Sequence, residues 1–298
     1  MDQRLAAFVE VVEQKGFSRA ASTLHMTQPA VSQQIRALER DLGARLLERS
    51  NRYLHLTAAG EIVYEHARQI LELEERMRRY VSDLTQAASG SLAIGASYTI
   101  GEYLLPHALA AFRRRHPLVT PTVTIANTQR IAELVVARRL EAGLVEGDVF
   151  LPQAQARPLF EDRLTIVAPP EHRLAGSRDI ALSELARETW IVREEGSGTR
   201  AASDSFFANY ALSSVSRLEF GSTQMIKEAV LAGMGVSLLS RWATRREVAQ
   251  GALVELAAPG TPCVRQFSVL TLRSRFQTRA LEVFLRLLDE MAPSLAAE

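Results

Sequence analysis

The sequence predicts a helical amino-terminal domain with a helix-turn-helix, then one long helix, then a larger α/β domain. Three observations lead to this fold class. Two short amphipathic segments flank a break within residues 16–43, apolar residues recur at heptad spacing between residues 57 and 88, and strand-like segments alternate with helical ones after residue 90. The 298 residues suffice for two or three units with cores of their own.

The helix-turn-helix is expected over residues 16–43. Ser18 is expected to cap its first helix, and the chain is expected to break at residues 25 and 26. Thr27 is a good N-cap for the second helix, and Pro29 falls in its first turn, where a missing N–H costs nothing. The segment therefore predicts two helices joined by a tight turn.

The second of these helices has two chemically different faces. Its apolar face consists of Val31, Ile35, Leu38 and Leu42. Its opposite face consists of Gln28, Pro29, Ser32, Gln33, Arg36 and Arg40. Glutamine pairs bidentately with adenine and arginine with guanine in the major groove of DNA, so this face suits base reading. A merely solvated amphipathic helix is the alternative that this pattern alone leaves open.

A helix before this pair and a hairpin after it complete the amino-terminal domain. The helix has Leu5, Phe8, Val9 and Val12 as its apolar face and is expected to close a small core. Leucines at positions 46, 47, 54 and 56 stand among polar residues and predict a short two-stranded wing. Arg49 and Arg52 fall at its tip, where they could reach phosphates or the minor groove. A tip that is only polar is the alternative.

The order of these motifs resembles the LysR-type transcriptional regulators over about the first ninety residues. The matching runs are Phe17-Ser-Arg-Ala-Ala-Ser, Thr27-Gln-Pro-Ala-Val-Ser, Leu38-Glu, Leu42-Gly, Leu46-Leu and Leu56-Thr-Ala-Ala-Gly60, together with Ile35, Arg49 and Arg52. The resemblance implies a winged helix-turn-helix DNA-binding domain in residues 1–58. The DNA-binding residues that we predict are Ser18, Thr27, Gln28, Pro29, Ser32, Gln33, Arg36, Arg49 and Arg52.

A long linker and dimerisation helix is expected over residues 59–89, capped by Thr57 although Gly60 stands where a capping box has Glu. Its heptad seam consists of Val63, Ile70, Leu73, Met77, Tyr80 and Leu84. Because so small a domain cannot cover this seam, we expect a second copy of the helix to cover it. A twofold dimer would then present two reading helices to an inverted repeat. Packing of the seam onto its own chain is the alternative.

Beyond a linker at residues 87–91, alternating strands and helices predict a parallel sheet and a second sheet unit that begins near residue 164. The expected strands are 91–96, 119–125, 142–145, 164–170, 190–193, 216–220, 233–239 and 267–272, with helices between them and at the end. The family resemblance, weaker here, implies a two-lobed effector domain akin to periplasmic binding proteins over residues 90–298. Lobe I would hold about 90–161 and 266–298, and lobe II about 162–265.

Hydroxyl-rich junctions between strands and helices mark the expected effector site. Free N–H groups at helix starts, together with hydroxyls and an arginine, suit an anion, and open sheets bind ligands at the carboxyl ends of their strands. The predicted effector-binding residues are Ser97, Tyr98, Thr99, Thr128, Ser197, Thr199 and Arg200. The alternatives are that these hydroxyls only cap helices, and that Arg200 pairs with Glu194 or Glu195.

In the LysR-type family the corresponding cleft binds a pathway metabolite as co-inducer. The run Ser97-Tyr-Thr-Ile-Gly-Glu-Tyr-Leu-Leu-Pro, with Gly196-Ser-Gly-Thr-Arg, resembles members linked to sulfur assimilation or carbon fixation. The resemblance implies a small, anionic effector: an oxyanion such as sulfite or sulfate, a small carboxylate, or a phosphorylated metabolite.

Composition bears on disulfides, metal sites and the location of the protein. A net charge of +1 and 47% hydrophobic residues describe an ordinary soluble protein. Cys263 is the single cysteine and the six histidines lie apart, so neither a disulfide within the chain nor a metal site is expected. The start lacks the pattern of a signal peptide and no apolar run has membrane-spanning length, so we expect a cytoplasmic protein without membrane contact.

Together these parts predict a transcription factor in which a metabolite closes the cleft and changes how the dimer's domains are arranged on DNA. The implied partners are double-stranded DNA, the co-inducer, further copies in a homodimer or homotetramer, and RNA polymerase. The alternative is an α/β enzyme with an accessory helical domain. The sequence has no GxSxG elbow, no P-loop lysine and no GxGxxG after a strand, so no catalytic residue and no cofactor are expected.

Overall fold

The computed structural model describes residues 3–49, 54–83, 88–147, 149, 151–212, 215–273 and 276–296. The chain divides into two compact units, Met1–Thr85 and Gln86–Glu298. Each unit has its own hydrophobic clusters. None of the helices in the described ranges is both long and apolar enough to cross a membrane.

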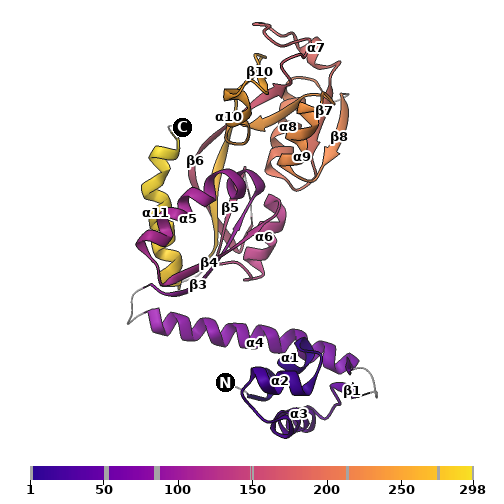
Figure 1. Cartoon of the computed structure of the whole chain (residues 1–298), viewed down its shortest axis with the longest axis vertical. Coiled ribbons are helices and arrows are strands. Elements are labelled where there is room, and N and C mark those ends of the chain that lie inside the picture. Colours follow the sequence, from indigo (N-terminus) through magenta and orange to yellow (C-terminus); the bar gives the residue numbers. More distant parts are fainter. Residues whose placement is uncertain are drawn as a thin grey trace. The chain divides into compact units, whose positions relative to one another are not determined.

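The first unit is a winged helix-turn-helix, as predicted. Its elements are α1 (Gln3–Glu13), α2 (Phe17–Thr23), α3 (Gln28–Leu42), β1 (Leu47–Arg49), β2 (Leu54–Leu56) and α4 (Ala58–Asp83) (Figure 1). The helices enclose a core that includes Phe8, Val31, Ile35 and Leu46. The two strands pair in antiparallel fashion and form the wing. Its tip, residues 50–53, lies outside the described residues.

Local signals set the helix-turn-helix. The hydroxyl of Thr27 accepts a hydrogen bond from the N–H of Ala30 at 3.4 Å, and Pro29 lies in the first turn of α3, as expected. His25 adopts a left-handed φ of 53°, which breaks the chain between the helices. The expectation that Ser18 caps α2 is wrong, because α2 begins at Phe17 and Ser18 is already inside its first turn.

The faces of α3 differ from the prediction at two positions. Val31, Ile35 and Leu38 are buried as expected, but Leu42 is half exposed because it lies in the last turn, beyond the core. Ser32 is buried although it was assigned to the outer face. At 100° per residue it lies on the flank of the helix beside Val31, where the neighbouring helices cover it.

The start of α4 explains its incomplete capping box. The hydroxyl of Thr57 accepts a hydrogen bond from the N–H of Gly60 at 2.9 Å. A Cβ atom on Gly60 would lie 2.1 Å from the carbonyl oxygen of Leu46, so no larger residue fits there. The helix is described as far as Asp83. The expectation that it continues to about residue 88 is wrong at its end, because Ala88 and Ser89 are not helical, while residues 84–87 lie outside the described residues.

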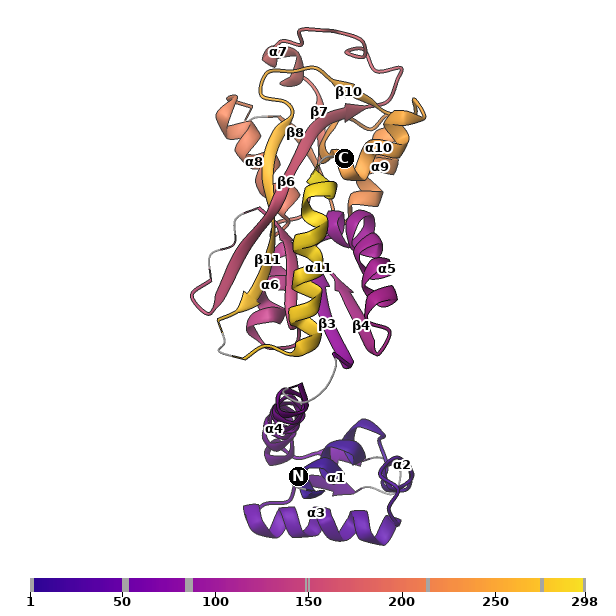
Figure 2. The ribbon, with the colours of Figure 1, turned by 90° about the vertical axis from the view of Figure 1, so that its left-hand side faces the viewer.

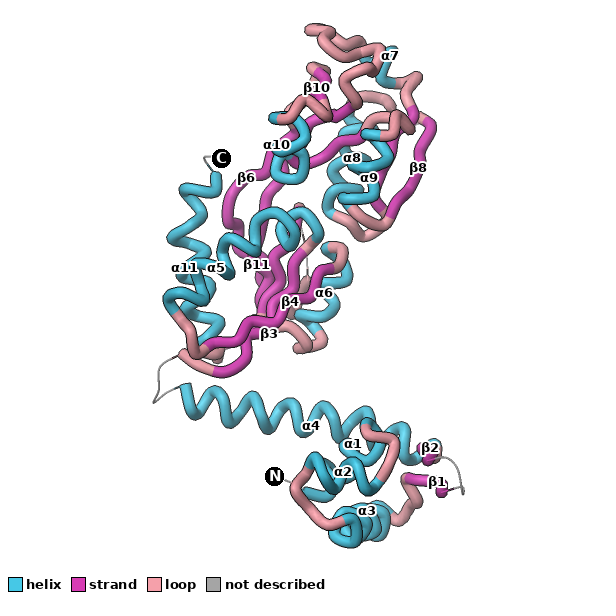
Figure 3. The backbone as a smooth tube through the Cα atoms, viewed as in Figure 1, coloured by secondary structure: helices cyan, strands magenta, loops and turns pink. Residues whose placement is uncertain are grey.

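The second unit is built on one seven-stranded mixed sheet (Figure 3). Its strands are β3 (Gly90–Ala96), β4 (Val119–Ile125), β5 (Ala142–Glu146), β6 (Ala154–Ala168), β9 (Ser237–Ser240), β10 (Val254–Leu256) and β11 (Cys263–Leu272). Their order is β10-β6-β11-β5-β3-β4, and β9 also pairs with β6. β3 runs parallel to β4 and β5, whereas β11 is antiparallel to β5 and β6. The prediction of a parallel sheet is therefore wrong beyond β5, because β11 returns from the second lobe in the opposite direction.

β6 and β11 are long neighbouring strands that run through both lobes (Figure 2). The predicted strands 164–170 and 267–272 correspond to only one end of each. The missed parts, residues 154–163 and 263–266, carry charged and polar side chains in alternation and lack an apolar run. β9 and β10 pair with β6, so the expected second sheet unit is largely a continuation of the first. The expected lobe borders fall inside β6 and β11.

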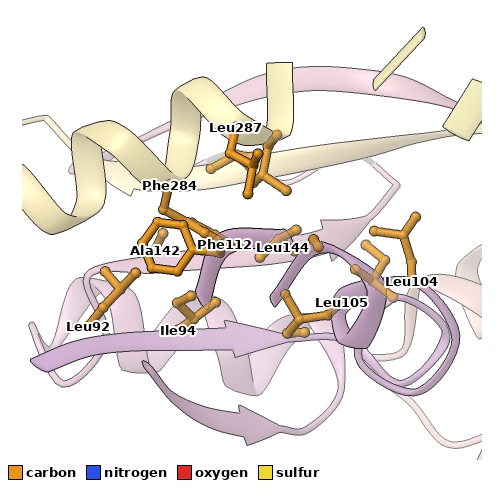
Figure 4. Packing of buried hydrophobic residues seen from close by; sticks show 14 of the residues in the cluster. Leu92, Ile94, Leu104, Leu105, Phe112, Ala142, Leu144, Phe284 and Leu287 are labelled. Carbon is orange, nitrogen blue, oxygen red and sulfur yellow. The ribbon is translucent and has the colours of Figure 1, made fainter. Parts of the chain in front are cut away.

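Helices cover both faces of the sheet in lobe I. α5 (Leu105–Arg115), preceded by the π-helical turn η1 (Ile100–Leu104), and the carboxyl-terminal α11 (Arg279–Ala296) cover one face, and α6 (Thr128–Val136) covers the other. Figure 4 shows Phe284 and Leu287 of α11 packed toward Phe112, Leu92 and Leu144. The rings of Phe112 and Phe284 meet edge to face with centroids 5.3 Å apart. α11 thus returns to the first lobe, as predicted.

Lobe II adds a small parallel pair of strands, β7 (Thr189–Arg193) and β8 (Ser216–Phe220). Its helices are α7 (Leu182–Leu185), α8 (Gly198–Asn209), α9 (Thr223–Leu231) and α10 (Arg241–Ala249). Trp190 is fully buried against Phe206 and Phe207 and donates its indole N–H to the carbonyl of Leu185 at 3.0 Å. The short α7 and β10 were not predicted.

Candidate DNA-binding and effector sites

The outer face of α3 is exposed and basic. Gln28, Pro29, Gln33, Arg36 and Arg40 are all exposed. A groove of about 850 Å³ runs along this face, lined by Pro29, Gln33, Arg36, Glu39, Arg40, Gly43, Ala44 and Arg45. Within the part of the chain that the structure describes, the Arg36 and Arg40 side chains have no hydrogen-bond or ion-pair partner. Their donors are therefore available to a ligand.

The two acidic residues near this face are engaged elsewhere. The Glu39 carboxylate accepts hydrogen bonds from the N–H groups of Leu46 and Leu47, at 2.9 and 3.4 Å. Asp41 forms an ion pair with Arg4 of α1. Glu39 thus holds the start of the wing, and the three arginines that line the groove set its charge.

The other predicted DNA-contacting residues differ from one another in exposure and in their hydrogen bonds. The buried Ser32 accepts a hydrogen bond from the side-chain amide of Gln28 at 3.2 Å, so it positions Gln28 within the first turns of α3. Ser18 is exposed on α2, and the Thr27 hydroxyl is used in the cap. Arg49 belongs to β1, but its side chain is not described, and Arg52 lies outside the described residues. Contacts of these residues with DNA stay predictions.

α4 has an apolar stripe that the single chain leaves exposed. Ile70, Leu73 and Met77 are 50%, 60% and 56% exposed. Ile62 and Val81, which the sequence reading missed, are exposed on the same side. Val63, assigned to the seam, is half-buried against the core of its own domain. The Tyr80 side chain and Leu84 lie outside what the structure describes.

A buried charge cluster joins β5, β6 and β11 at the centre of the second unit. Arg265 of β11 donates to the Glu146 carboxylate at 2.6 Å and to the Asp162 carboxylate at 2.7 Å. All three side chains are buried. Asp162 also accepts a hydrogen bond from the Ser240 hydroxyl at 2.6 Å. Two acids therefore share one arginine, so the described cluster has one acid more than it has cations.

The predicted hydroxyls of the effector site converge on Glu146. One carboxylate oxygen accepts from the Ser97 hydroxyl at 2.8 Å and from the Thr99 N–H at 3.1 Å. The other accepts from the Thr199 hydroxyl at 3.1 Å as well as from Arg265. Arg265 also reaches the hydroxyls of Thr199 and Thr99, at 3.0 and 3.5 Å. The chain's own carboxylate thus occupies the place where the sequence reading expected an external anion.

Burial and ion pairing act oppositely on the two acids. Burial alone raises the pKa of Glu146, but Arg265 and the hydrogen bonds from Ser97, Thr99 and Thr199 outweigh it and hold that pKa below its ordinary value. Burial dominates at Asp162 and raises the pKa of that carboxyl, against the effect of Arg265. Glu146 is thus the acid that the site keeps ionised.

A cavity of about 610 Å³ adjoins this cluster between α6 of lobe I and α8 of lobe II. Its apolar wall includes Ala132, Val136, Val149, Leu151 and Ala201. Its polar wall includes Thr128, Gln129, Ser197 and Arg200 together with four acids, Glu133, Glu146, Glu195 and Asp204. Arg200 is paired with Asp204 at 2.9 Å and Glu219 at 2.6 Å. The expected alternative for Arg200, pairing with Glu194 or Glu195, is wrong, because Asp204 and Glu219 are its partners and Glu194 pairs with Arg193.

The lobes also touch through cations of lobe II and tyrosines of lobe I. The Arg193 guanidinium lies over the Tyr98 ring, 4.4 Å from its centroid, and donates from Nε and Nη2 to the Glu194 carboxylate, both at 2.7 Å. The Lys227 ammonium lies 5.2 Å from the centroid of Tyr103. Burial raises the pKa of Tyr103, which keeps its phenol protonated. Tyr98 therefore serves the contact between the lobes and is not on the cavity wall.

The structure brings together most of the predicted effector residues but divides their roles. Thr128, Ser197 and Arg200 line the cavity, whereas Ser97, Thr99 and Thr199 bind Glu146. The sequence reading missed Glu146, Asp162 and Arg265. Glu146 could have been found, because it is a charged residue at the end of an apolar strand, in the run Gly143-Leu-Val-Glu146. No group of three potential metal ligands occurs among the described residues.

Comparisons with known proteins match both units. Residues 3–61 match the family described as "Bacterial regulatory helix-turn-helix protein, lysR family", and residues 85–293 match "LysR substrate binding domain". The transcriptional regulator CysL of Bacillus subtilis is 35% identical over 95% of each chain. The RuBisCO operon transcriptional regulator of Allochromatium vinosum is 31% identical, over 95% of this chain and 93% of its own. The Synechocystis CcmR regulatory domain in complex with 2-PG is 27% identical with a TM-score of 0.64, and covers 68% of this chain and 98% of its own.

Replacing Arg265 by methionine should strongly destabilise the second unit, because two buried carboxylates would lose their partner. The expected loss is about 3–5 kcal/mol in the free energy of unfolding. Arg163→Met, which alters an exposed arginine on the neighbouring strand, is the matched control and should change stability by less than about 0.5 kcal/mol. Denaturant unfolding of the full chain measures both, and equal losses in the two variants would contradict the assignment.

Proposed function

The chain belongs to the LysR family of transcriptional regulators, and from that premise we propose that α3 is its DNA-reading helix and that the α6–α8 cavity is its effector site. Members of this non-enzymatic family bind DNA through the helix-turn-helix and respond to small molecules. The chain is a DNA-binding regulator of this kind. As a DNA-binding regulator it is expected in the cytoplasm, where the chromosome lies.

The observation that carries the DNA proposal is the basic face of α3, whose Arg36 and Arg40 have no partner among the described residues. Gln33, Arg36 and Arg40 project from a helix whose other side is fixed in the core by Val31 and Ile35. A rigid helix with free glutamine and arginine donors suits base edges in the major groove. Arg49 and Arg52 of the wing would add phosphate or minor-groove contacts, and Ser18, Thr27 and Gln28 would position the helix on the backbone.

The exposed stripe of α4 supports a dimer. Ile70, Leu73 and Met77 leave a continuous apolar strip along a helix of 26 residues that the single chain does not cover. The same strip on a second copy would cover it and would place two reading helices on an inverted repeat. Tyr80 and Leu84 would extend this contact. Tetramer formation and contact with RNA polymerase belong to the same proposal and follow from family membership.

The cavity supports an organic effector. Its apolar wall fits a carbon skeleton, while Thr128, Gln129 and Ser197 offer hydrogen-bonding groups beside it. Arg200 is the cation on the described part of the wall, and a carboxylate or phosphate could exchange with one of its two acidic partners. The CcmR regulatory domain, bound to 2-PG, is a structural neighbour with a ligand of this type. We therefore favour a small carboxylate or phosphorylated metabolite over a bare oxyanion.

Arg36→Ala tests the reading helix. The variant should lose base preference at one position in each half-site, by about 1–3 kcal/mol, because a direct base contact is removed. Arg52→Ala should instead weaken binding to many sequences alike. Selection from a randomised DNA library measures both, with the exposed Arg187→Ala of lobe II as control. If Arg36→Ala keeps the wild-type preference at every position, α3 is not placed in the groove as proposed.

Met77→Glu tests the dimer. Two glutamates in the covered strip would repel each other without a partner, and the protein should dissociate to monomers. Met77→Leu preserves the apolar surface and should remain dimeric. Light scattering during size-exclusion chromatography gives the mass of each variant. A dimer of unchanged stability for Met77→Glu would remove α4 from the interface.

Arg200→Gln tests the effector cavity. Loss of the cation should lower the affinity for an acidic effector by about 1.5–3 kcal/mol, the range for a hydrogen bond to a charged group. Calorimetric titration with 2-PG, sulfate and sulfite, using wild type and the exposed Arg187→Gln as references, provides the comparison. Binding of any of these ligands that Arg200→Gln leaves untouched would place that ligand elsewhere.

A further inference from the structure

The hydroxyl site around Glu146 has the composition of an oxyanion-binding site. Its donors are the hydroxyls of Ser97 and Thr199, the N–H of Thr99 and the guanidinium of Arg265, all within 3.1 Å of the Glu146 oxygens. Charge-assisted donors of this kind bind sulfate, phosphate and carboxylates in proteins. Here each carboxylate oxygen already accepts two hydrogen bonds, so no described donor of the set is left over for a second anion.

Charge and space both oppose a second anion. Arg265 already faces two carboxylates, so an added oxyanion would bring a further negative charge into a buried cluster without a further cation. The start of α8 also approaches the end of β5 closely, because a Cβ atom on Gly198 would lie 2.4 Å from the Glu146 carbonyl oxygen. The carboxylate and the backbone around it fill the site.

We propose that Glu146 is a built-in anionic ligand of this hydroxyl site and the residue that excludes free inorganic oxyanions from it. The effector is then confined to the α6–α8 cavity, and its specificity for an organic molecule follows from this exclusion. Ser97, Thr99 and Thr199 act as positioning residues that hold the Glu146 carboxylate on Arg265. This inference deepens the proposed function and rests on it only where it assigns the neighbouring cavity to the effector.

The proposal separates Glu146 from an ordinary structural acid, because a built-in ligand can be replaced by a free one. Glu146→Ala removes the carboxylate but leaves every donor in place, and the adjoining cavity gives a small anion access, since Glu146 is part of its wall. Acetate or formate should then occupy the site in the variant. Glu146→Gln fills the same volume without the charge and leaves no room for the added anion, so it is the matched control.

The experiment is thermal unfolding of the full chain with sodium formate, acetate or sulfate, against sodium chloride at equal ionic strength. Glu146→Ala should unfold at a lower temperature than wild type. Its Tm should rise by about 3–5 °C when the anion is roughly tenfold above its Kd. Wild type and Glu146→Gln should respond to formate no more than to chloride. If Glu146→Ala accumulates poorly, its refolding yield with and without formate gives the same comparison.

Three results would overturn the proposal. The first is an equal response of all three proteins to formate, and the second is no response of Glu146→Ala. The third is sulfate binding by the wild-type protein that Thr199→Val abolishes, since that would place a free oxyanion on the same donors. Neither readout uses DNA or an effector. Failure here therefore leaves the DNA and cavity proposals standing, and failure of those leaves this one testable.

Discussion

The ion-pair cluster of Arg265 with Glu146 and Asp162 is the interaction on which the second unit depends. Burying three charges is tolerable only when their geometry is precise, because each loses its hydration and must recover it from neighbours. The partners come from β5, β6 and β11, and the hydroxyls that complete the cluster come from the starts of η1 and α8. Both lobes must therefore be in place before the charges are satisfied. The cluster thus links, through ion pairs and hydrogen bonds, elements that are far apart in sequence.

The parts of this architecture that depend on local chemistry could be predicted from the sequence. Thr27, Pro29 and the apolar spacing of Val31, Ile35 and Leu38 specify α3 within a few residues of chain, and the structure confirms them. The regular alternation of strands and helices from residue 91 to 145 likewise gave the first half of the α/β domain. The first half of β6 could not be found in this way, because it contains no apolar run, and its Arg157 pairs with Asp289 of α11, far away in the sequence.

In the candidate sites, too, contacts between residues far apart in the sequence could not be predicted. The sequence indicated where hydroxyls gather at helix starts, and the structure places Ser97, Thr99 and Thr199 together. It could not indicate their partner, because Arg265 lies 119 positions from Glu146 and only the fold brings them together. The burial of Leu42 and Ser32 was also not predictable from the sequence pattern. Helical periodicity states the direction of a side chain, but not how far along the helix the neighbouring core extends.

The continuity of β6 and β11 through both lobes limits how the effector domain can move. Two hydrogen-bonded strands resist stretching and sideways shear, but they bend and twist at little cost. One lobe can thus rotate against the other by bending or twisting this strand pair, whereas separating the lobes would break its hydrogen bonds. Arg265 and Asp162 lie side by side on these two strands, within the segment that any such rotation must deform. Bending or twisting the strand pair therefore changes the geometry of the buried ion pair, which lies near one end of the paired segment.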